Sequence, residues 1–279
     1  MKTQSKNLFL LGLLIFLAII LTACPPDPDP DPEPEPDPNP VVTLPITMKF
    51  GSDFQKLLVG ANLKANSEAT SFKASATPAP TGVTTETLSA DDSETACVAW
   101  LDDATKTIYY YAKGYTDAGK KIPVSSFNFM FAACSTLETI DISGFDTSAV
   151  AHFGQLFQSC TALTTIVGLD TLNTTSAQRF IKMFYNCPAL TEIDISSFDA
   201  SKVVYAEDMF GLCTNLTTIY AKAGTDWSSI ATITSSVGMF TNCTSLKGGA
   251  NTVYDSTKTD KSYARIDGGT SAPGYFTEK

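Results

Sequence analysis

Histidine is almost absent from this chain, since His152 is the single one among 279 residues. A metal site built from several histidines is therefore excluded. A catalytic triad around His152 would draw on Ser148 and Asp146, which are nearby in sequence. A short turn does not position three such side chains, so we expect a structural or exposed histidine.

Basic residues are also few, with 19 Lys and Arg against 29 Asp and Glu and a net charge of −10. Residues 41–279 alone carry 17 basic and 23 acidic side chains, a net of −6, without a basic cluster. Nucleic acid binding needs grouped Lys and Arg to neutralise phosphates. We therefore expect no nucleic acid partner.

No apolar run is long enough to span a membrane. The run from Leu8 to Leu21 follows two lysines, and its 14 residues would reach only about 21 Å as a helix. Because a bilayer core is roughly 30 Å thick, a secretory signal over residues 1–23 fits better. The run ends in Leu21-Thr22-Ala23-Cys24, which resembles the lipobox of bacterial lipoproteins. The resemblance implies an acylated Cys24 that anchors the protein to a membrane. The alternative is an ordinary signal peptide with a chance cysteine.

The next segment, residues 24–40, is rich in proline. From Pro25 to Pro40, nine of sixteen residues are proline, alternating with Asp, Glu and one Asn. Proline fixes φ and lacks an N–H, so we predict an extended polyproline II stalk of roughly 50 Å. Calcium binding by this acidic run is the alternative, but an extended alternation points carboxylates apart instead of around one ion.

An internal repeat dominates the rest of the chain. In five units a phenylalanine is followed at +3 by cysteine and at +6 by leucine, and in the first four an isoleucine follows at +9. The units start at Phe131, Phe157, Phe184, Phe210 and Phe240, at intervals of 26, 27, 26 and 30 residues. Such periods indicate stacked repeats in the leucine-rich-repeat range of about 20–29 residues. Phe, Cys and Leu would share one face of a short helical turn, and the alternation after them predicts a strand.

We therefore predict an α/β fold, a leucine-rich-repeat solenoid of about five coils over residues 124–250. It would have a parallel β-sheet face and short helical or 3₁₀ turns. Terminal coils leave apolar faces bare, so residues 41–123 are expected to form a small β-rich N-terminal cap and residues 251–279 a C-terminal cap. Within the N-terminal cap, Cys97–Leu101 and Lys106–Tyr111 predict a hairpin.

Two coils depart from the repeat. The unit from Leu156 is one residue longer, at Gly168 to Leu172, and the last interval carries Asp226-Trp227. We expect these coils to bulge, which puts an unbroken strand ladder in doubt there.

The pairs Met130-Phe131, Met183-Phe184 and Met209-Phe210, with Phe145-Asp146-Thr147-Ser148, resemble the BspA-like family of bacterial leucine-rich-repeat surface proteins. The closing stretch Tyr263 to Phe276 is similar to the terminal segment of such proteins. The resemblance implies an exported protein, lipid-anchored to the bacterial cell envelope at the outer membrane and exposed on the surface. It also implies adhesion to a protein partner, such as a host matrix protein or a bacterial surface protein.

The repeat cysteines invite a metal or redox interpretation. They are Cys134, Cys160, Cys187, Cys213 and Cys243. Side chains stacked in parallel about 4.8 Å apart cannot surround zinc tetrahedrally, and their parallel Cβ vectors argue against disulfides. We expect a ladder of buried thiols, a buried thiol at Cys97, no metal and no cofactor. Asp141 and Asp194, two coils apart, would lie about 10 Å from each other, beyond the range of inverting glycosidases, so no enzyme activity is expected.

The exposed strand face remains as the candidate site. With the strand isoleucines inward, alternation turns eight residues outward. They are Thr139, Asp141, Thr165, Val167, Glu192, Asp194, Thr218 and Tyr220. Repeat folds present such faces to macromolecules, so we predict a protein-binding face. The alternative is a structural surface-coat lipoprotein whose solvated face has no dedicated ligand.

Overall fold

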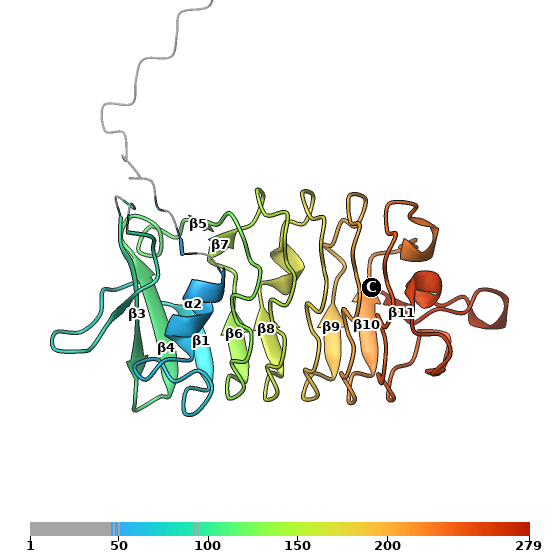
Figure 1. Cartoon of the computed structure of the whole chain (residues 1–279), viewed down its shortest axis with the longest axis horizontal. Coiled ribbons are helices and arrows are strands. Elements are labelled where there is room, and N and C mark those ends of the chain that lie inside the picture. The colour runs from blue at the N-terminus through green and yellow to red at the C-terminus, as the bar shows by residue number, and fades with distance from the viewer. Residues whose placement is uncertain (1–45, 47, 50, 92, 94) are drawn as a thin grey trace, which may run out of the picture. The chain divides into compact units, whose positions relative to one another are not determined.

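The first described elements are one short helix and five strands. The computed structural model describes residues 46, 48–49, 51–91, 93 and 95–279, so the predicted signal peptide, Cys24 and the stalk lie outside the described residues. The elements are α2 (Gly51–Leu58), β1 (Ser71–Ala74), β2 (Glu86–Thr87), β3 (Cys97–Asp102), β4 (Thr107–Ala112) and β5 (Ile122–Pro123) (Figure 1). In the part of the chain that the structure describes, no helix is long and apolar enough to cross a membrane.

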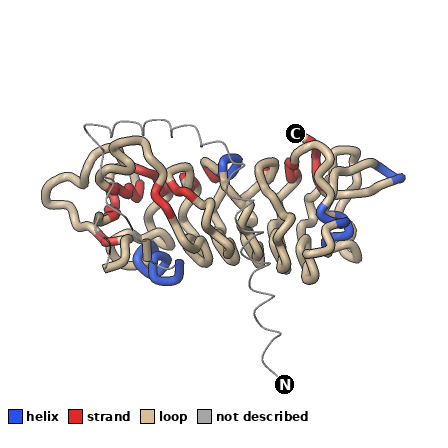
Figure 2. Tube along the Cα trace, turned by 90° about the horizontal axis from the view of Figure 1, so that it is seen from above, coloured by secondary structure: helices blue, strands red, loops and turns tan. Residues whose placement is uncertain are grey.

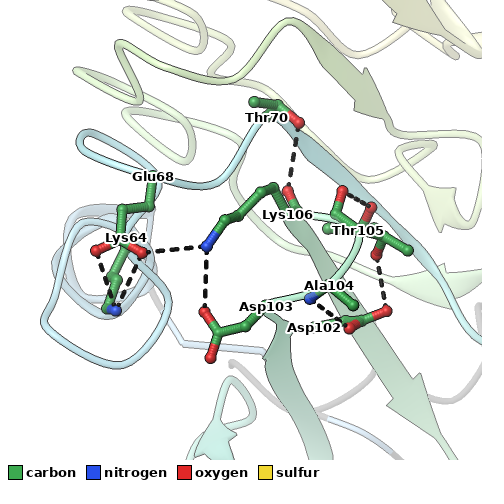
Figure 3. A network of polar contacts seen from close by, with 9 residues as sticks. Lys64, Glu68, Thr70, Asp102, Asp103, Ala104, Thr105 and Lys106 are labelled. Carbon is green, nitrogen blue, oxygen red and sulfur yellow. Dashed lines mark hydrogen bonds and ion pairs between the residues drawn. The ribbon is translucent and has the colours of Figure 1, made fainter.

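The predicted hairpin is confirmed as β3 and β4, which pair antiparallel from Cys97 with Ala112 to Asp102 with Thr107. Its turn is held by Asp102, whose carboxylate accepts hydrogen bonds from the Ala104 N–H at 3.0 Å and the Thr105 hydroxyl at 2.7 Å (Figure 3). Aspartate at the start of a turn commonly binds the backbone two residues on.

The N-terminal elements continue directly into the repeats. One sheet has the strand order β2-β3-β4-β1-β6-β8, in which β1 is parallel to both β4 and β6 (Thr139–Asp141). Thr70, just before β1, accepts hydrogen bonds from the N–H groups of Glu138 and Thr139, and it donates to Lys106. The first coil therefore has its open strand edge covered by β1, a strand that the sequence analysis did not predict.

Each of the first four repeats adds one short strand. These are β6, β8 (Thr165–Val167), β9 (Glu192–Asp194) and β10 (Thr218–Ala221), and the chain returns through β11 (Phe276–Glu278) to pair with β10. Registers repeat: Ile140 lies opposite Ile166, and Ile193 opposite Ile219. The fifth unit has no strand at this position in the described structure, and β11 takes the place beside β10.

The coils also pair along a second line, outside the named strands. Single parallel bridges join His152 to Arg179, Arg179 to Tyr205, and Tyr205 to Ser235. Figures 1 and 2 show these units side by side, with loops and turns making up most of each coil. A short strand, β7 (Phe145–Asp146), pairs with β5. The 3₁₀ helices are η1 (Leu169–Thr171), η2 (Trp227–Ser229), η3 (Lys261–Tyr263) and η4 (Gly269–Ser271).

A column of phenylalanine rings forms the centre of the stack. Rings of successive units are stacked with centroids 5.6 to 5.9 Å apart. Phe54 of α2 meets the ring of Phe131 edge-on at 5.9 Å, and Tyr275 meets Phe240 edge-on at 5.1 Å. The aromatic column thus ends against an edge-on ring at each side, an arrangement that aromatic quadrupoles favour.

The segment from Phe to Leu in each unit is a series of turns, not the short helical or 3₁₀ turn that we expected. Hydrogen bonds join residues three apart, as from Cys134 to Phe131 and from Leu137 to Cys134. Between them the backbone enters the left-handed region, with φ of 60° at Ala133 and 58° at Asn186. A left-handed residue interrupts a right-handed helix, so the segment coils in separate turns.

The strand ladder is interrupted between β8 and β9, which belong to different sheets. Figure 1 shows a wider separation between these two strands than between β6 and β8 or between β9 and β10. Gly168 lies directly after β8, at the interruption. Its φ is 86°, and a Cβ at this position would meet the Ser143 Cα at 2.7 Å. The expected break in the strand ladder at the longer coil is confirmed, and η1 lies where the neighbouring coils have turns at residues 143–144 and 196–197.

Candidate protein-binding face

The strand face is built as the alternation predicts. Ile140, Ile193 and Ile219 are at most 2% exposed. The residues between them are exposed or half-buried at all eight predicted positions, namely Thr139, Asp141, Thr165, Val167, Glu192, Asp194, Thr218 and Tyr220. The first two pairs lie on the six-stranded sheet and the last two pairs on the three-stranded sheet, so the interruption divides the face.

Two carboxylates of the strand face accept hydrogen bonds that hold the turns after their strands. Asp141 accepts hydrogen bonds from the Ser143 N–H at 2.9 Å and its hydroxyl at 2.6 Å. Asp194 accepts from the Ser196 N–H at 2.9 Å. These are Asx turns, which aspartate forms with the backbone two residues on. Strand alternation alone predicts two free surface charges here, whereas the recurring Asp-x-Ser spacing is the sequence signal that identifies such turns.

A groove opens where the ladder is interrupted. It has a volume of about 440 Å³ and lies between residues 164–170 and 190–194, with Tyr220 and Lys279 at its border. Ile166 is half-buried here, whereas Ile140, its counterpart in the preceding coil, is fully buried. Val167 beside it is 43% exposed. The groove therefore offers apolar side chains at a position that the regular coils cover.

The groove carries acidic charge. Asp170, Glu192 and Asp194 line it, and Lys279 forms an ion pair with Asp194. Partial burial is the largest single influence on Asp194 and raises its pKa, but hydrogen bonds from Lys279 and Ser196 together outweigh it, so the pKa lies below its ordinary value. The same contact raises the pKa of Lys279. The groove thus already holds one ammonium group against a carboxylate.

The cysteine ladder is buried, as predicted, and it makes contacts that the sequence did not reveal. The Sγ of Cys160 donates to the carbonyl of Phe131 at 3.0 Å, and Cys187 repeats this bond to Phe157 at 3.0 Å. Burial raises the pKa of each thiol, to about 12 for Cys213. The thiols of the last four units, Cys160, Cys187, Cys213 and Cys243, are therefore neutral donors that link each coil to the preceding one. All six described cysteines, including Cys97, are free thiols.

His152 lies at the bridge to Arg179, and its Nδ1 is buried without a hydrogen-bond partner. No cluster of three or more His, Cys, Asp or Glu side chains suited to a metal ion occurs within the described ranges.

A second hollow, of about 850 Å³, lies beside the N-terminal hairpin and was not anticipated. Its lining includes Trp100, Tyr109, Lys64 and Asp103. Figure 3 shows that the charged groups at this border pair with one another: Lys64 with Glu68 at 3.1 Å, and Lys106 with Asp103 at 3.6 Å and Glu68 at 3.5 Å. Because these charges already have partners, they do not define a ligand.

Comparison with known proteins gives a family match within the repeat region. Residues 124–253 match a family described as "Mycoplasma protein of unknown function, DUF285". No curated protein and no solved structure matches the chain. The match covers nearly the same residues as the predicted repeats, while the resemblance to BspA-like proteins stays a prediction.

Proposed function

We propose that this chain is a lipid-anchored bacterial surface protein that presents a leucine-rich-repeat solenoid, related to the BspA-like proteins, for protein binding or adhesion. Its partner would be a host matrix protein or a protein of another bacterial cell. Cys24 would carry the lipid at the outer membrane, and residues 24–40 would act as the spacer.

The observation that carries this proposal is the strand face. The isoleucine at the centre of each of the four strands keeps its place, while the outward residue after it varies from coil to coil, as in Asp141, Val167 and Tyr220. Outward residues can vary without disturbing the stack, so this is the face on which the sequence can change to form a binding surface. Binding is favoured over catalysis because the nucleophiles found inside the coils are thiols whose pKa is raised by burial.

The alternative is a structural surface-coat lipoprotein. The paired charges beside the N-terminal hairpin and the Asx turns on the strand face favour it, since these polar groups serve the fold. A coat protein would need a stable stack and no dedicated ligand.

Adhesion of cells that carry the protein separates the two functions. Glu192→Gln together with Thr218→Ala changes the face without touching an Asx turn, and we expect adhesion to immobilised matrix proteins to fall while folding is retained. Lys202→Ala, an exposed change away from the strands, is the matched control. If the parent protein confers no adhesion beyond that of cells lacking it, the coat function is favoured instead.

A further inference from the structure

The edge of β8 that faces β9 has unpaired backbone groups. Thr165 turns its N–H toward β6, donating to Glu138 at 3.1 Å, and the carbonyl of Val167 accepts from Ile142 at 2.9 Å. Successive residues of an extended strand direct their N–H and C=O groups to alternate sides. The N–H and C=O of Ile166 therefore point into the groove, and no backbone bond joins residues 164–168 to residues 190–194.

The facing edge of β9 has the same property. The carbonyl of Thr191 accepts from Thr217 at 2.9 Å, and the Ile195 N–H donates to Tyr220 at 2.8 Å, so alternate residues of β9 are directed toward β10. By the same alternation, the N–H and C=O groups of Glu192 and Asp194 point toward β8. The groove is thus bordered on both sides by strand edges with unpaired donors and acceptors, which are templates for an additional strand.

The groove also provides room and an apolar contact. Its 440 Å³ falls in the range of about 300–1,000 Å³ typical of ligand sites. Elsewhere the coils stay in contact across this junction: the Phe157 and Phe184 rings are stacked at 5.7 Å, and the Phe157 N–H donates to Met183 at 2.9 Å. The two coils therefore separate at the strand face while remaining joined behind it.

We propose that an extended peptide segment of a partner protein binds in this groove as an additional β-strand, with Lys or Arg side chains against Asp170, Glu192 and Asp194. The proposal rests on the protein-binding function and names the chemistry of the partner. The ion pair of Lys279 with Asp194 shows that the groove accommodates a lysine ammonium. The chain's own residues 25–40 do not suit the groove, because they are acidic and alternate prolines lack the N–H that a ladder needs.

Peptide binding to the purified protein tests the proposal. The probe is a fluorescent seven-residue peptide of alternating Lys and Val, followed by fluorescence anisotropy. We expect it to bind, with affinity falling as salt is added. Two matched peptides should bind at least about tenfold more weakly: one with Glu in place of Lys, which reverses the charge, and one with N-methylated alternate residues, which cannot donate to the ladder.

Variants locate the site. Glu192→Gln should weaken the binding of the basic peptide several-fold, whereas Lys279→Ala should strengthen it, because the competing ammonium is removed from Asp194. Glu138→Gln is the control, since this exposed residue lies outside the groove. Deletion of Gly168 restores the 26-residue interval and should allow β8 to pair with β9, which abolishes binding.

Hydrogen exchange supplies a readout that needs no peptide. The amides of Ile166, Glu192 and Asp194 should exchange faster than that of Tyr220 in the free protein and become protected when the basic peptide binds. Amides that are already protected in the free protein, equal binding of the N-methylated peptide, or no binding of the basic peptide would overturn the proposal. None of these results would abolish adhesion of intact cells, so the proposed function is judged separately by that assay.

Discussion

The phenylalanine column predicts that stability is shared along the stack, and Phe184 at its centre is the position to test. Its ring is fully buried and stacks on Phe157 at 5.7 Å and on Phe210 at 5.6 Å. Phe184→Leu keeps most of the apolar volume but removes two aromatic contacts worth about 0.5–1.5 kcal/mol each, so we expect a loss of about 1–3 kcal/mol in the free energy of unfolding. Phe184→Ala should lose about 3–5 kcal/mol because it also leaves a cavity.

Urea unfolding followed by tryptophan fluorescence measures this effect at two places. Trp100 lies in the N-terminal sheet, and Trp227 packs 6.1 Å from Phe180 in the repeats. Replacing one tryptophan by Phe leaves the other as the single probe. In both single-tryptophan proteins, Phe184→Leu should shift the urea midpoint by the same amount if the stack unfolds as one unit. A double-mutant cycle should show coupling between Phe184→Leu and Phe210→Leu, and little between Phe184→Leu and Phe240→Leu, which are not in contact.

The reasoning is refuted if Phe184→Leu changes stability by no more than the exposed control Lys202→Ala, for which about 0.5 kcal/mol is the usual limit. Equal coupling in the two cycles would show that the rings act only through burial and not through stacking.

Three further predictions follow from other contacts. Cys187→Ala should cost about 1–2 kcal/mol through a small cavity and the lost bond to Phe157, and thiol reagents should modify the protein at pH 8 only after denaturation. The Ser148 N–H lowers the pKa of Asp146, so its contribution is present above the unfolded pKa of about 3.9 and is lost as pH falls through the lower folded value; thermal melting from pH 5 to pH 2 should depend less on pH in Asp146→Asn. Mass spectrometry of the native protein should find a chain beginning at acylated Cys24, and an unmodified start at another residue would contradict the anchor.

The face carboxylates require a change in how the binding site is tested. From the sequence, joint replacement of Asp141, Glu192 and Asp194 by Ala is expected to leave folding nearly intact. The structure contradicts this for two of the three, because Asp141 and Asp194 hold turns, and loss of such a side-chain bond to the backbone costs on the order of 1 kcal/mol. Weaker adhesion of that triple variant would therefore have two causes, lower stability and lost contacts with the partner. Glu192 makes no such bond to its turn, so its replacement tests the contacts alone.

The repeat pattern by itself determined which residues are inside. A residue at a fixed place in each coil meets its own counterpart in the next coil, so period and alternation are sufficient to place Phe157, Cys187 and Ile193 in the core. The β3–β4 hairpin was equally local, since its two strands are adjacent in the sequence.

Only the tertiary structure decided the pairings between distant segments. β1 joins β6, and β11 takes the place beside β10, because each covers a strand edge that the repeats leave open, and many short segments could satisfy such an edge. The groove between β8 and β9 lies at the coil that has one additional residue, where Gly168 adopts a left-handed backbone directly before η1. A sequence shows that such a residue is present, but whether the ladder bulges and recovers or separates depends on how both neighbouring coils pack around it.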